Sequence, residues 1–387
     1  MNMAYDGHQA SSTRQELPLI SVVMANFRGG RHLEAAMRSV LAQTWPRLEL
    51  ILADDASDDN SLAIADAVAA TDDRVRVLRA DRNQGPAITR NRALDSAQGD
   101  WIAIVDSDDL IHPSRLERLV AAAYESGAGI VADDLVYFGA AEARGGRTLL
   151  QSLSLTGPMT LEPALYLRAN AGDSRIPGFG YLKPLISRST LQHHRYDPNL
   201  QIGEDYDLIL RLLLEGAQFV LLPDPLYAYR RHASSISYRM TVERQAAMLA
   251  AHRALPPMPD AAARRAAGDV DRHLRRALRY EELVRDLKDR RLAALPRLAD
   301  PAMLRRLAAS LNDRRRRKAA QEAVSELPLG AVSCVELPRP GQFWSQSPAA
   351  AAAAIAAEAS LGRNALPSAA PEWARWLDKA VRDSVQA

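Results

Sequence analysis

The sequence is poor in cysteine, in net charge and in long apolar runs. Its single cysteine, Cys334, excludes an intrachain disulfide and fits a reducing compartment. The formal net charge of the 387 residues is only +2, so the distribution of charge matters more than its sum. The longest low-polarity run, 349–357, is nearly all alanine and too short to span a membrane. Residues 1–17 lack the pattern of a secretory signal, so we expect a flexible tail there and no transmembrane anchor.

From residue 20 onward, strand-like and helix-like segments alternate. Apolar strands are predicted at 20–26, 48–53, 75–78, 101–105 and 129–136. Helices are predicted between them at 31–43, 62–70, 87–97 and 113–126. This alternation builds βαβ units, so we expect an α/β fold with a mostly parallel sheet. Farther along, helices at 160–169 and 205–215, an extended stretch at 180–187 and short strands at 219–222 and 226–229 predict that mixed or antiparallel strands complete the sheet.

The composition changes near residue 238. Beyond it alanine, leucine and arginine dominate, and helices punctuated by prolines are predicted around 242–255, 261–287, 303–323 and 371–384. We therefore expect three parts: the tail (1–17), an α/β domain (18–238) and a helical C-terminal region (239–387) with a loose, Pro/Ala-rich segment near 328–368.

Three carboxylates, Asp106, Asp108 and Asp109, follow the apolar strand at 101–105. A strand that is apolar on both faces belongs in a covered sheet, and open α/β sheets bind ligands at the carboxyl ends of such strands. Like charges repel one another unless something positive compensates them, and two carboxylates suit Mg²⁺ or Mn²⁺. The pattern predicts a metal site at Asp106 and Asp108; an Asx turn with a helix cap is the structural alternative.

A second acidic cluster, containing Asp54 and Asp55, follows the strand at 48–53. Carboxylates there can accept hydrogen bonds from a nucleotide base or ribose, and they can equally cap the next helix. A calcium loop is disfavoured, because Asn60 and Asp66 stand where such a loop needs Gly and Glu.

Asn83 and Gly85 precede a helix that contains Arg90. A Gly-containing turn at a helix N-terminus offers N–H groups to an anion, and Arg90 adds charge that suits phosphate, although the same residues also make an ordinary turn. Arg230 and His232 follow the last predicted strand and suit phosphate and metal, respectively, but a histidine in a polar loop is more often simply solvated.

Asp205 begins the helix predicted at 205–215. It lies one helical turn before Leu208 and Ile209, so it continues the apolar stripe that faces the core, whereas Asp207 belongs to a more solvated face. An inward carboxylate is costly unless it is paired or used, so Asp205 is a candidate catalytic group; an ordinary acidic residue in a first helical turn is the alternative.

Together these motifs resemble the family-2 glycosyltransferases with the GT-A fold. The resemblance covers 20 to about 237 and rests on 21–26 (SVVMAN), 54–57 (DDAS), 83–85 (NQG) with 90–91 (RN), 99–102 (GDWI), 106–109 (DSDD) and 203–205 (GED). The stretches 180–184 (GYLKP) and 202–206 (IGEDY) look more narrowly like the succinoglycan-type exopolysaccharide glucosyltransferases of bacteria. The chain departs from the family pattern at Ala25, where Tyr is usual, and at Ala56, where Gly is usual.

The resemblance implies a Rossmann-like GT-A domain that transfers a hexose, glucose, from a UDP-sugar to an acceptor hydroxyl with inversion, using Mg²⁺ or Mn²⁺. Carried over by motif, Asp205 is the base that takes the acceptor proton. The residues implied at the donor are Asp54 or Asp55 for uridine, Arg90 for uridine or phosphate, Asp106 for ribose, and Asn83, Gly85, Lys183 and Arg230 nearby. The metal is implied at Asp106, Asp108 and His232, with Asp108 in direct contact, Asp106 acting on ribose or through water, and Asp109 capping the next turn.

On this hypothesis the enzyme is cytoplasmic, peripheral on the inner face of the membrane, and extends a lipid-linked oligosaccharide. The basic C-terminal helices, including 314–318, have a solvated helix face as their default interpretation. Together with Trp344, Trp373 and Trp376 they also suit an anionic lipid surface. Nucleic acid is not expected, since no aromatic residues interleave the basic ones. Two alternatives stay open: a sugar nucleotidyltransferase, which lacks support from a Gly- and Lys-rich loop near the first strand, and a non-catalytic protein that binds a nucleotide sugar or a membrane surface.

Overall fold

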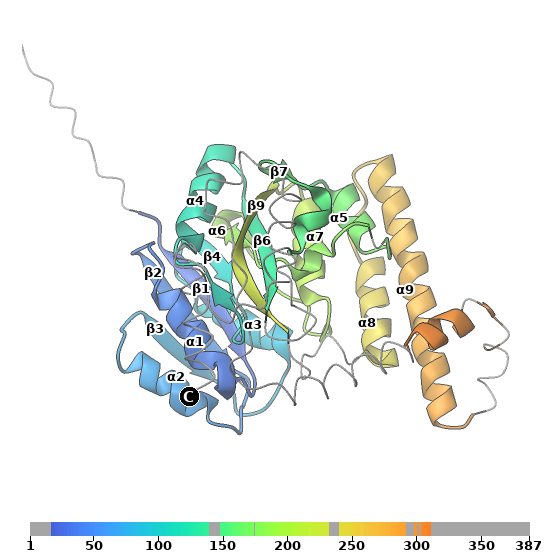
Figure 1. Ribbon diagram of the computed structural model, residues 1–387, viewed down its shortest axis with the longest axis horizontal. Helices are drawn as coiled ribbons and strands as arrows, with labels where there is room; N and C mark the ends of the chain where they lie inside the picture. The colour runs from blue at the N-terminus through green and yellow to red at the C-terminus, as the bar shows by residue number, and fades with distance from the viewer. Residues whose placement is uncertain are drawn as a thin grey trace, which may run out of the picture.

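A mixed sheet runs through the protein (Figure 1). The computed structural model describes residues 17–138, 148–173, 175–231, 240–291, 298, 300–301 and 303–310. Within these residues the sheet has nine strands in the order β3-β2-β1-β4-β8-β6-β9-β5, and β7 also pairs with β9. The strands are β1 (Ile20–Asn26), β2 (Leu48–Asp54), β3 (Val75–Arg79), β4 (Trp101–Ile104), β5 (Leu110–Ile111), β6 (Ile130–Phe138), β7 (Met159–Thr160), β8 (Leu185–Ser187) and β9 (Phe219–Arg230).

The pairing directions confirm the predicted α/β fold. Strand β1 pairs in parallel with β2 and with β4, and β2 pairs in parallel with β3. Strands β6 and β9 are parallel as well, whereas the short strands β5, β7 and β8 join by antiparallel pairing. The carboxyl ends of β1, β2 and β4 therefore meet at one edge of the sheet.

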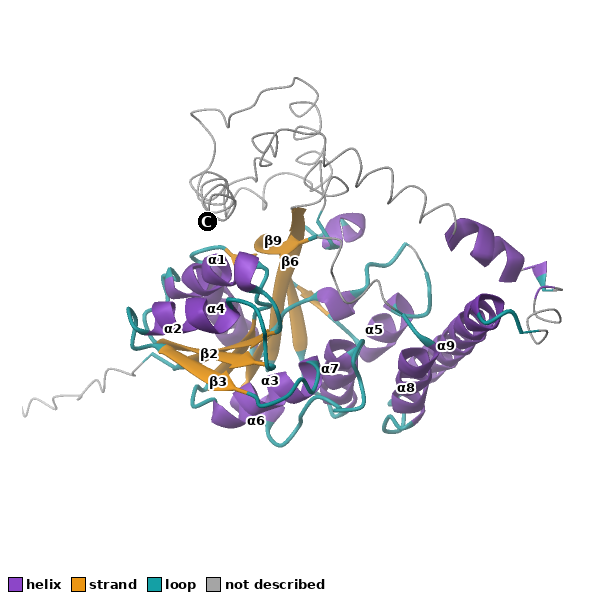
Figure 2. Cartoon of the chain, turned by 90° about the horizontal axis from the view of Figure 1, so that it is seen from below, coloured by secondary structure: helices purple, strands orange, loops and turns teal. Residues whose placement is uncertain are grey.

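Helices cover both faces of the sheet (Figure 2). They are α1 (Gly30–Leu41), α2 (Ser61–Ala69), α3 (Pro86–Ser96), α4 (Arg115–Ser126), α5 (Pro163–Ala169), α6 (Arg188–Leu191), α7 (Glu204–Leu214), α8 (Val242–Arg253) and α9 (Ala261–Lys288). Alternate strand residues face opposite sides: Val23 and Ile51 share a core with α3, α5 and α7, whereas Val22 and Leu50 share one with α1, α2 and α4. Burial on both faces explains why these strands are continuously apolar.

Two predictions of secondary structure were wrong. The short strands predicted at 219–222 and 226–229 form one strand, β9, which passes through Pro223 and Pro225. Proline cannot donate a ladder hydrogen bond, and these prolines fall where the register between β6 and β9 shifts on either side of Asp134. The stretch predicted as extended at 180–187 begins instead with a 3-10 turn, η3 (Phe179–Tyr181), before β8.

The C-terminal helices pack on the α5 side of the domain. Leu249 of α8 and Ala263 and Val270 of α9 belong to the same apolar core as α5 and α7. No helix in the described ranges is both long and apolar enough to cross a membrane. Several predictions lie outside the described residues: those for residues 1–16, the boundary at 238, the helix predicted at 303–323 beyond residue 310, the basic stretch 314–318, the segment 328–368, the helix at 371–384, and Trp344, Trp373 and Trp376.

Candidate active site

Asp54 is held by the turn that follows β2. It is the register partner of Asn26, whose Nδ2 donates to Asp54 Oδ2 at 2.8 Å. The backbone N–H and the hydroxyl of Ser57 donate to the two carboxylate oxygens at 2.8 and 2.7 Å. The side chain of Asp54 is buried, so these contacts place it as the group that closes the turn at 54–57.

Asp55 accepts hydrogen bonds from the backbone N–H groups before α3, which were predicted to bind an anion. Its two oxygens accept hydrogen bonds from the backbone N–H of Gln84 at 2.9 Å and of Gly85 at 2.8 Å. Gly85 adopts φ +89° here, a left-handed backbone that favours glycine, while Asn83 beside it is exposed. The prediction that this turn offers these N–H groups to a ligand was wrong, because the anion at the N-terminus of α3 is the protein's own Asp55.

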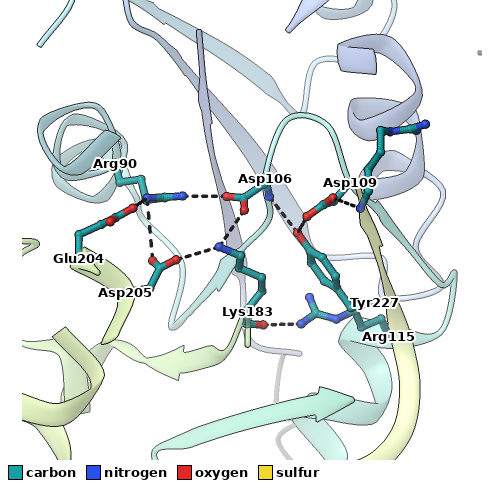
Figure 3. Close-up of polar contacts among 9 residues, drawn as sticks. Arg90, Asp106, Asp109, Arg115, Lys183, Glu204, Asp205 and Tyr227 are labelled. Atoms are coloured by element: carbon teal, nitrogen blue, oxygen red, sulfur yellow. Dashed lines mark hydrogen bonds and ion pairs between the residues drawn. The ribbon is translucent and has the colours of Figure 1, made fainter. Parts of the chain in front are cut away.

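Five charged side chains from four segments form one network of polar contacts (Figure 3). Arg90 of α3 donates to Asp106 Oδ1 at 2.8 Å and to Glu204 Oε1 at 2.6 Å. The Nζ atom of Lys183 lies 2.8 Å from Asp106 Oδ2 and 2.8 Å from Asp205 Oδ2. Asp106 therefore contacts a cationic side chain with each of its oxygens, and Lys183 bridges it to Asp205.

The charges in this network fix the ionisation of its members. Burial alone would raise the pKa of Asp106, but the charges of Lys183 and Arg90 outweigh burial and hold that pKa well below its ordinary value. Burial alone would lower the pKa of Lys183, but the charges of Asp106 and Asp205 outweigh it and raise that pKa. Burial raises the pKa of Glu204 even though Arg90 opposes the change. At neutral pH Asp106 is thus a carboxylate and Lys183 an ammonium group.

Asp109 connects the end of β4 to β9 and does not cap the turn that follows it. Its oxygens accept hydrogen bonds from the Tyr227 hydroxyl at 2.7 Å and from the backbone N–H of Arg230 at 2.6 Å. Both oxygens are therefore engaged by β9, so the prediction that Asp109 caps the next turn was wrong. Burial, together with the charges of Asp108 and Asp106, raises the pKa of Asp109 well above its ordinary value.

Arg230 lies beside the acidic strand end. Its Nε donates to the backbone oxygen of Asp108 at 2.6 Å, and its guanidinium lies 4.4 Å from the ring centre of Phe138. Asp108 is only partly buried. His232, the predicted third metal ligand, lies outside the described residues.

The first turn of α7 differs from the prediction in one respect. Asp205 faces the charged network, 3.9 Å from Arg90 as well as 2.8 Å from Lys183. Asp207, predicted on a more solvated face, is buried and pairs with Arg211 at 2.9 Å. The ion pair offsets the cost of burying the carboxylate, which is why a charged residue can lie there.

A fully buried ion pair, Arg115 with Asp133, lies next to the network and contacts the backbone of Lys183. Arg115 contacts both oxygens of Asp133, donates to the backbone oxygen of Lys183, and lies with its guanidinium 4.9 Å from the ring centre of Tyr227. Sequence reasoning missed this pair and the role of Glu204. A usable signal was present in Asp133, a charge inside an apolar strand that needs a partner when buried.

Known proteins match this unit. The glycosyl transferase family 2 profile matches residues 21–178. Succinoglycan biosynthesis protein ExoO of Rhizobium meliloti (strain 1021) is 33% identical over 312 residues, which is 79% of this chain and 88% of that protein. ExoU, also a succinoglycan biosynthesis protein of that organism, is 29% identical over 222 residues, or 56% of this chain and 64% of ExoU.

Solved structures give the same picture of the fold. TarS 1–349 of S. aureus in complex with UDP-GlcNAc has a TM-score of 0.54 and 19% sequence identity, covering 67% of this chain and 72% of that one. At this identity the likeness shows the fold alone, and it confirms the expected GT-A arrangement. With the profile match and a 33%-identical relative covered over 88% of its length, this chain belongs to glycosyltransferase family 2.

Proposed function

We propose that this glycosyltransferase moves a hexose, glucose, from a UDP-sugar to a hydroxyl group of a lipid-linked oligosaccharide in exopolysaccharide synthesis, with inversion at the anomeric carbon. The succinoglycan relatives and the UDP-GlcNAc complex of TarS support the substrate classes. The observation that carries the proposal is the placement of Asp205, which Lys183 holds opposite Asp106 at the carboxyl ends of the parallel strands.

On the acceptor side, Asp205 acts as general base. Its carboxylate lies on the first turn of α7 and is held by Lys183, so it can take the proton of an acceptor hydroxyl as that oxygen attacks the anomeric carbon. Attack from one face with departure of the diphosphate from the other inverts the configuration, and this needs one base. No second carboxylate has to act as a nucleophile.

On the donor side, the residues fit one divalent cation shared with the diphosphate. No group of three or more His, Cys, Asp or Glu side chains suited to a metal occurs among the described residues. Mg²⁺ and Mn²⁺ bind with one or two carboxylates when substrate phosphates complete the shell. Both Asp106 oxygens contact cations, so Asp108 fits direct contact and Asp106 fits ribose or a water-mediated contact. When bound, the cation stabilises the charge that develops on the departing diphosphate.

We also propose a peripheral contact of α9 with an anionic membrane surface, on the cytoplasmic side. The support is a set of exposed arginines on this helix, of which Arg264, Arg265, Arg276 and Arg279 are joined by Arg272, Arg275 and Arg285, the last three paired with Asp269, Asp271 and Glu243. Each basic group near such a surface contributes about 1 kcal/mol. The protein should sediment with vesicles that contain anionic lipid and not with neutral vesicles, and it should be released by salt; equal sedimentation with both vesicle types would contradict this contact.

The function is tested with UDP-glucose, Mn²⁺ and glycoside acceptors. Asp205→Asn should lower the transfer rate by roughly 10²–10⁴-fold, since it removes the base. Asp207→Asn, two residues along the same helix but paired with Arg211, is the matched control and should retain transfer. Chelation should abolish transfer and Mn²⁺ should restore it. Full activity of Asp205→Asn removes the base assignment, and release of pyrophosphate from a nucleoside triphosphate with sugar phosphate would instead show a nucleotidyltransferase.

A further inference from the structure

An exposed tyrosine lies next to the charged network and takes no part in it. Tyr181 belongs to the η3 turn, two residues before Lys183, and 43% of its surface is exposed. The other exposed large hydrophobic residues in the described part of the chain lie on other segments: Leu17, Phe27, Tyr124, Leu287 and Leu304. Tyr181 is therefore a single exposed ring. Single exposed apolar side chains are normal on a protein surface, so a role for Tyr181 has to be argued from its contacts.

Tyr181 belongs to a cluster of three aromatic rings. Its ring meets that of Tyr229 edge to face, with centres 6.1 Å apart and planes at 86°, and Tyr229 meets Tyr137 in the same manner at 5.8 Å and 80°. These three rings come from η3, β9 and β6, so they fix the loop to the sheet. Edge-to-face pairs contribute about 0.5–1.5 kcal/mol beyond burial, which holds the ring of Tyr181 in one orientation.

The same turn is packed against the helix that carries Asp205. A Cβ atom added at Gly180 would lie 3.2 Å from Cβ of Tyr206, so the backbone of η3 touches the first turn of α7. The ring of Tyr181 also meets Tyr229 of β9, and the next residue of that strand, Arg230, donates through Nε to the backbone oxygen of Asp108. Tyr181 thus lies between the base-bearing helix and the β9 strand that borders the donor side.

We propose that Tyr181, whose ring packs edge to face with that of Tyr229, is the platform on which a sugar ring of the acceptor stacks. The inference rests on the proposed function, because it supplies the acceptor for Asp205. A pyranose ring has one face of C–H groups and a rim of hydroxyls, so it suits an aromatic face that adjoins charged hydrogen-bonding groups. Stacking on Tyr181 would direct a rim hydroxyl toward the carboxylate that Lys183 holds.

The kinetic test varies a saccharide acceptor, methyl β-glucoside, at saturating UDP-glucose. Tyr181→Ala should raise the acceptor KM about tenfold, while Tyr181→Phe, which keeps the ring, should stay within about twofold of the wild type. Hydrolysis of UDP-glucose without acceptor should not change in either variant. Tyr124→Ala is the matched control, because Tyr124 is also an exposed tyrosine that meets another ring edge to face, Trp101 on β4. An unchanged KM in Tyr181→Ala, or an equal rise in Tyr124→Ala, overturns the inference.

A binding measurement separates this inference from the proposed reaction. Saturation-transfer NMR with methyl β-glucoside needs no turnover, and it should show transfer to the ring C–H protons in the wild type and in Asp205→Asn, but not in Tyr181→Ala. Equal transfer in the wild type and Tyr181→Ala, including its absence in both, refutes the platform. If Asp205→Asn transfers sugar at the wild-type rate, the proposed base is refuted. The NMR result for Tyr181 does not depend on that outcome.

Discussion

Replacing Lys183 by methionine tests the electrostatic centre of the site. The ammonium group lies 2.8 Å from Asp106 and 2.8 Å from Asp205, so the two contacted oxygens are no more than twice 2.8 Å apart. Without the cation between them, two carboxylates at about 5.6 Å repel by ~3 kcal/mol at an effective dielectric constant of about 20. Arg90 remains in contact with Asp106 and offsets part of this cost. We expect Lys183→Met to lower the free energy of unfolding by about 2–3 kcal/mol.

Urea denaturation at pH 7.5 measures this loss, and a double-mutant cycle assigns it. Asp106→Asn removes one of the two carboxylates, so the variant carrying both Lys183→Met and Asp106→Asn should be more stable than the sum of the single effects predicts. The expected coupling energy is about 2–3 kcal/mol, within the range for side chains of one network. Lys183→Arg, which keeps a positive charge, is the control. Additive single effects, with a coupling energy below about 0.5 kcal/mol, would refute the electrostatic account.

The pH dependence has a definite sign. The pKa of Asp106 is lower in the folded protein than its ordinary value of 3.8, so its ionised form contributes stability above pH 3.8, and that contribution is lost only as the pH falls through the folded value. In Lys183→Met the pKa of Asp106 rises, because burial is then opposed by Arg90 alone. The variant should therefore lose less stability than the wild type when the pH falls below 4.

Two further predictions rest on single positions. Ala56 has φ +60°, where an L-residue is strained, so Ala56→Gly should raise the free energy of unfolding by about 0.5–1 kcal/mol in urea; a destabilised variant would contradict this. Burial raises the pKa of Asp134 to about 7, so the wild type loses stability as the pH rises from 4 to 7. Asp134→Asn can accept the same backbone hydrogen bonds from Leu135 and Leu150, so it should be more stable than the wild type at pH 8 and not at pH 4; parallel pH profiles would count against it.

The part of the fold that the sequence predicts is the part whose signal is local. Continuously apolar strands such as β1 and β2, separated by helices, indicate a covered parallel sheet without knowledge of their partners. The continuity of β9 through Pro223 and Pro225 is not local, because it depends on a register shift in β6, some ninety residues earlier. The antiparallel insertion of β8 between β4 and β6 likewise depends on tertiary pairing, which no period in the sequence records.

The same distinction divides the predictions about the site. Acidic residues were expected to bind ligands at the carboxyl ends of β2 and β4, and Asp205 was singled out by its helical position. What could not be predicted is which charges meet. Asp55 takes the N–H groups at the start of α3, and Arg90 binds Glu204, 114 residues away, because these loops are folded against one another. A sequence shows which residues are charged, whereas the contacts between charged residues on different loops depend on how those loops pack.

The supporting ion pair decides what the Lys183 experiment measures. Arg115 holds the backbone oxygen of Lys183 and the ring of Tyr227, and the Tyr227 hydroxyl accepts a hydrogen bond from the backbone N–H of Asp106 at 3.1 Å. The guanidinium of Arg115 therefore contacts the backbone of Lys183 directly and that of Asp106 through Tyr227. Asp133 neutralises its charge. This frame contains no atom of the Lys183 side chain, so Lys183→Met should change the charge between Asp106 and Asp205 while their supports remain. The coupling energy then reports electrostatics rather than collapse of the site.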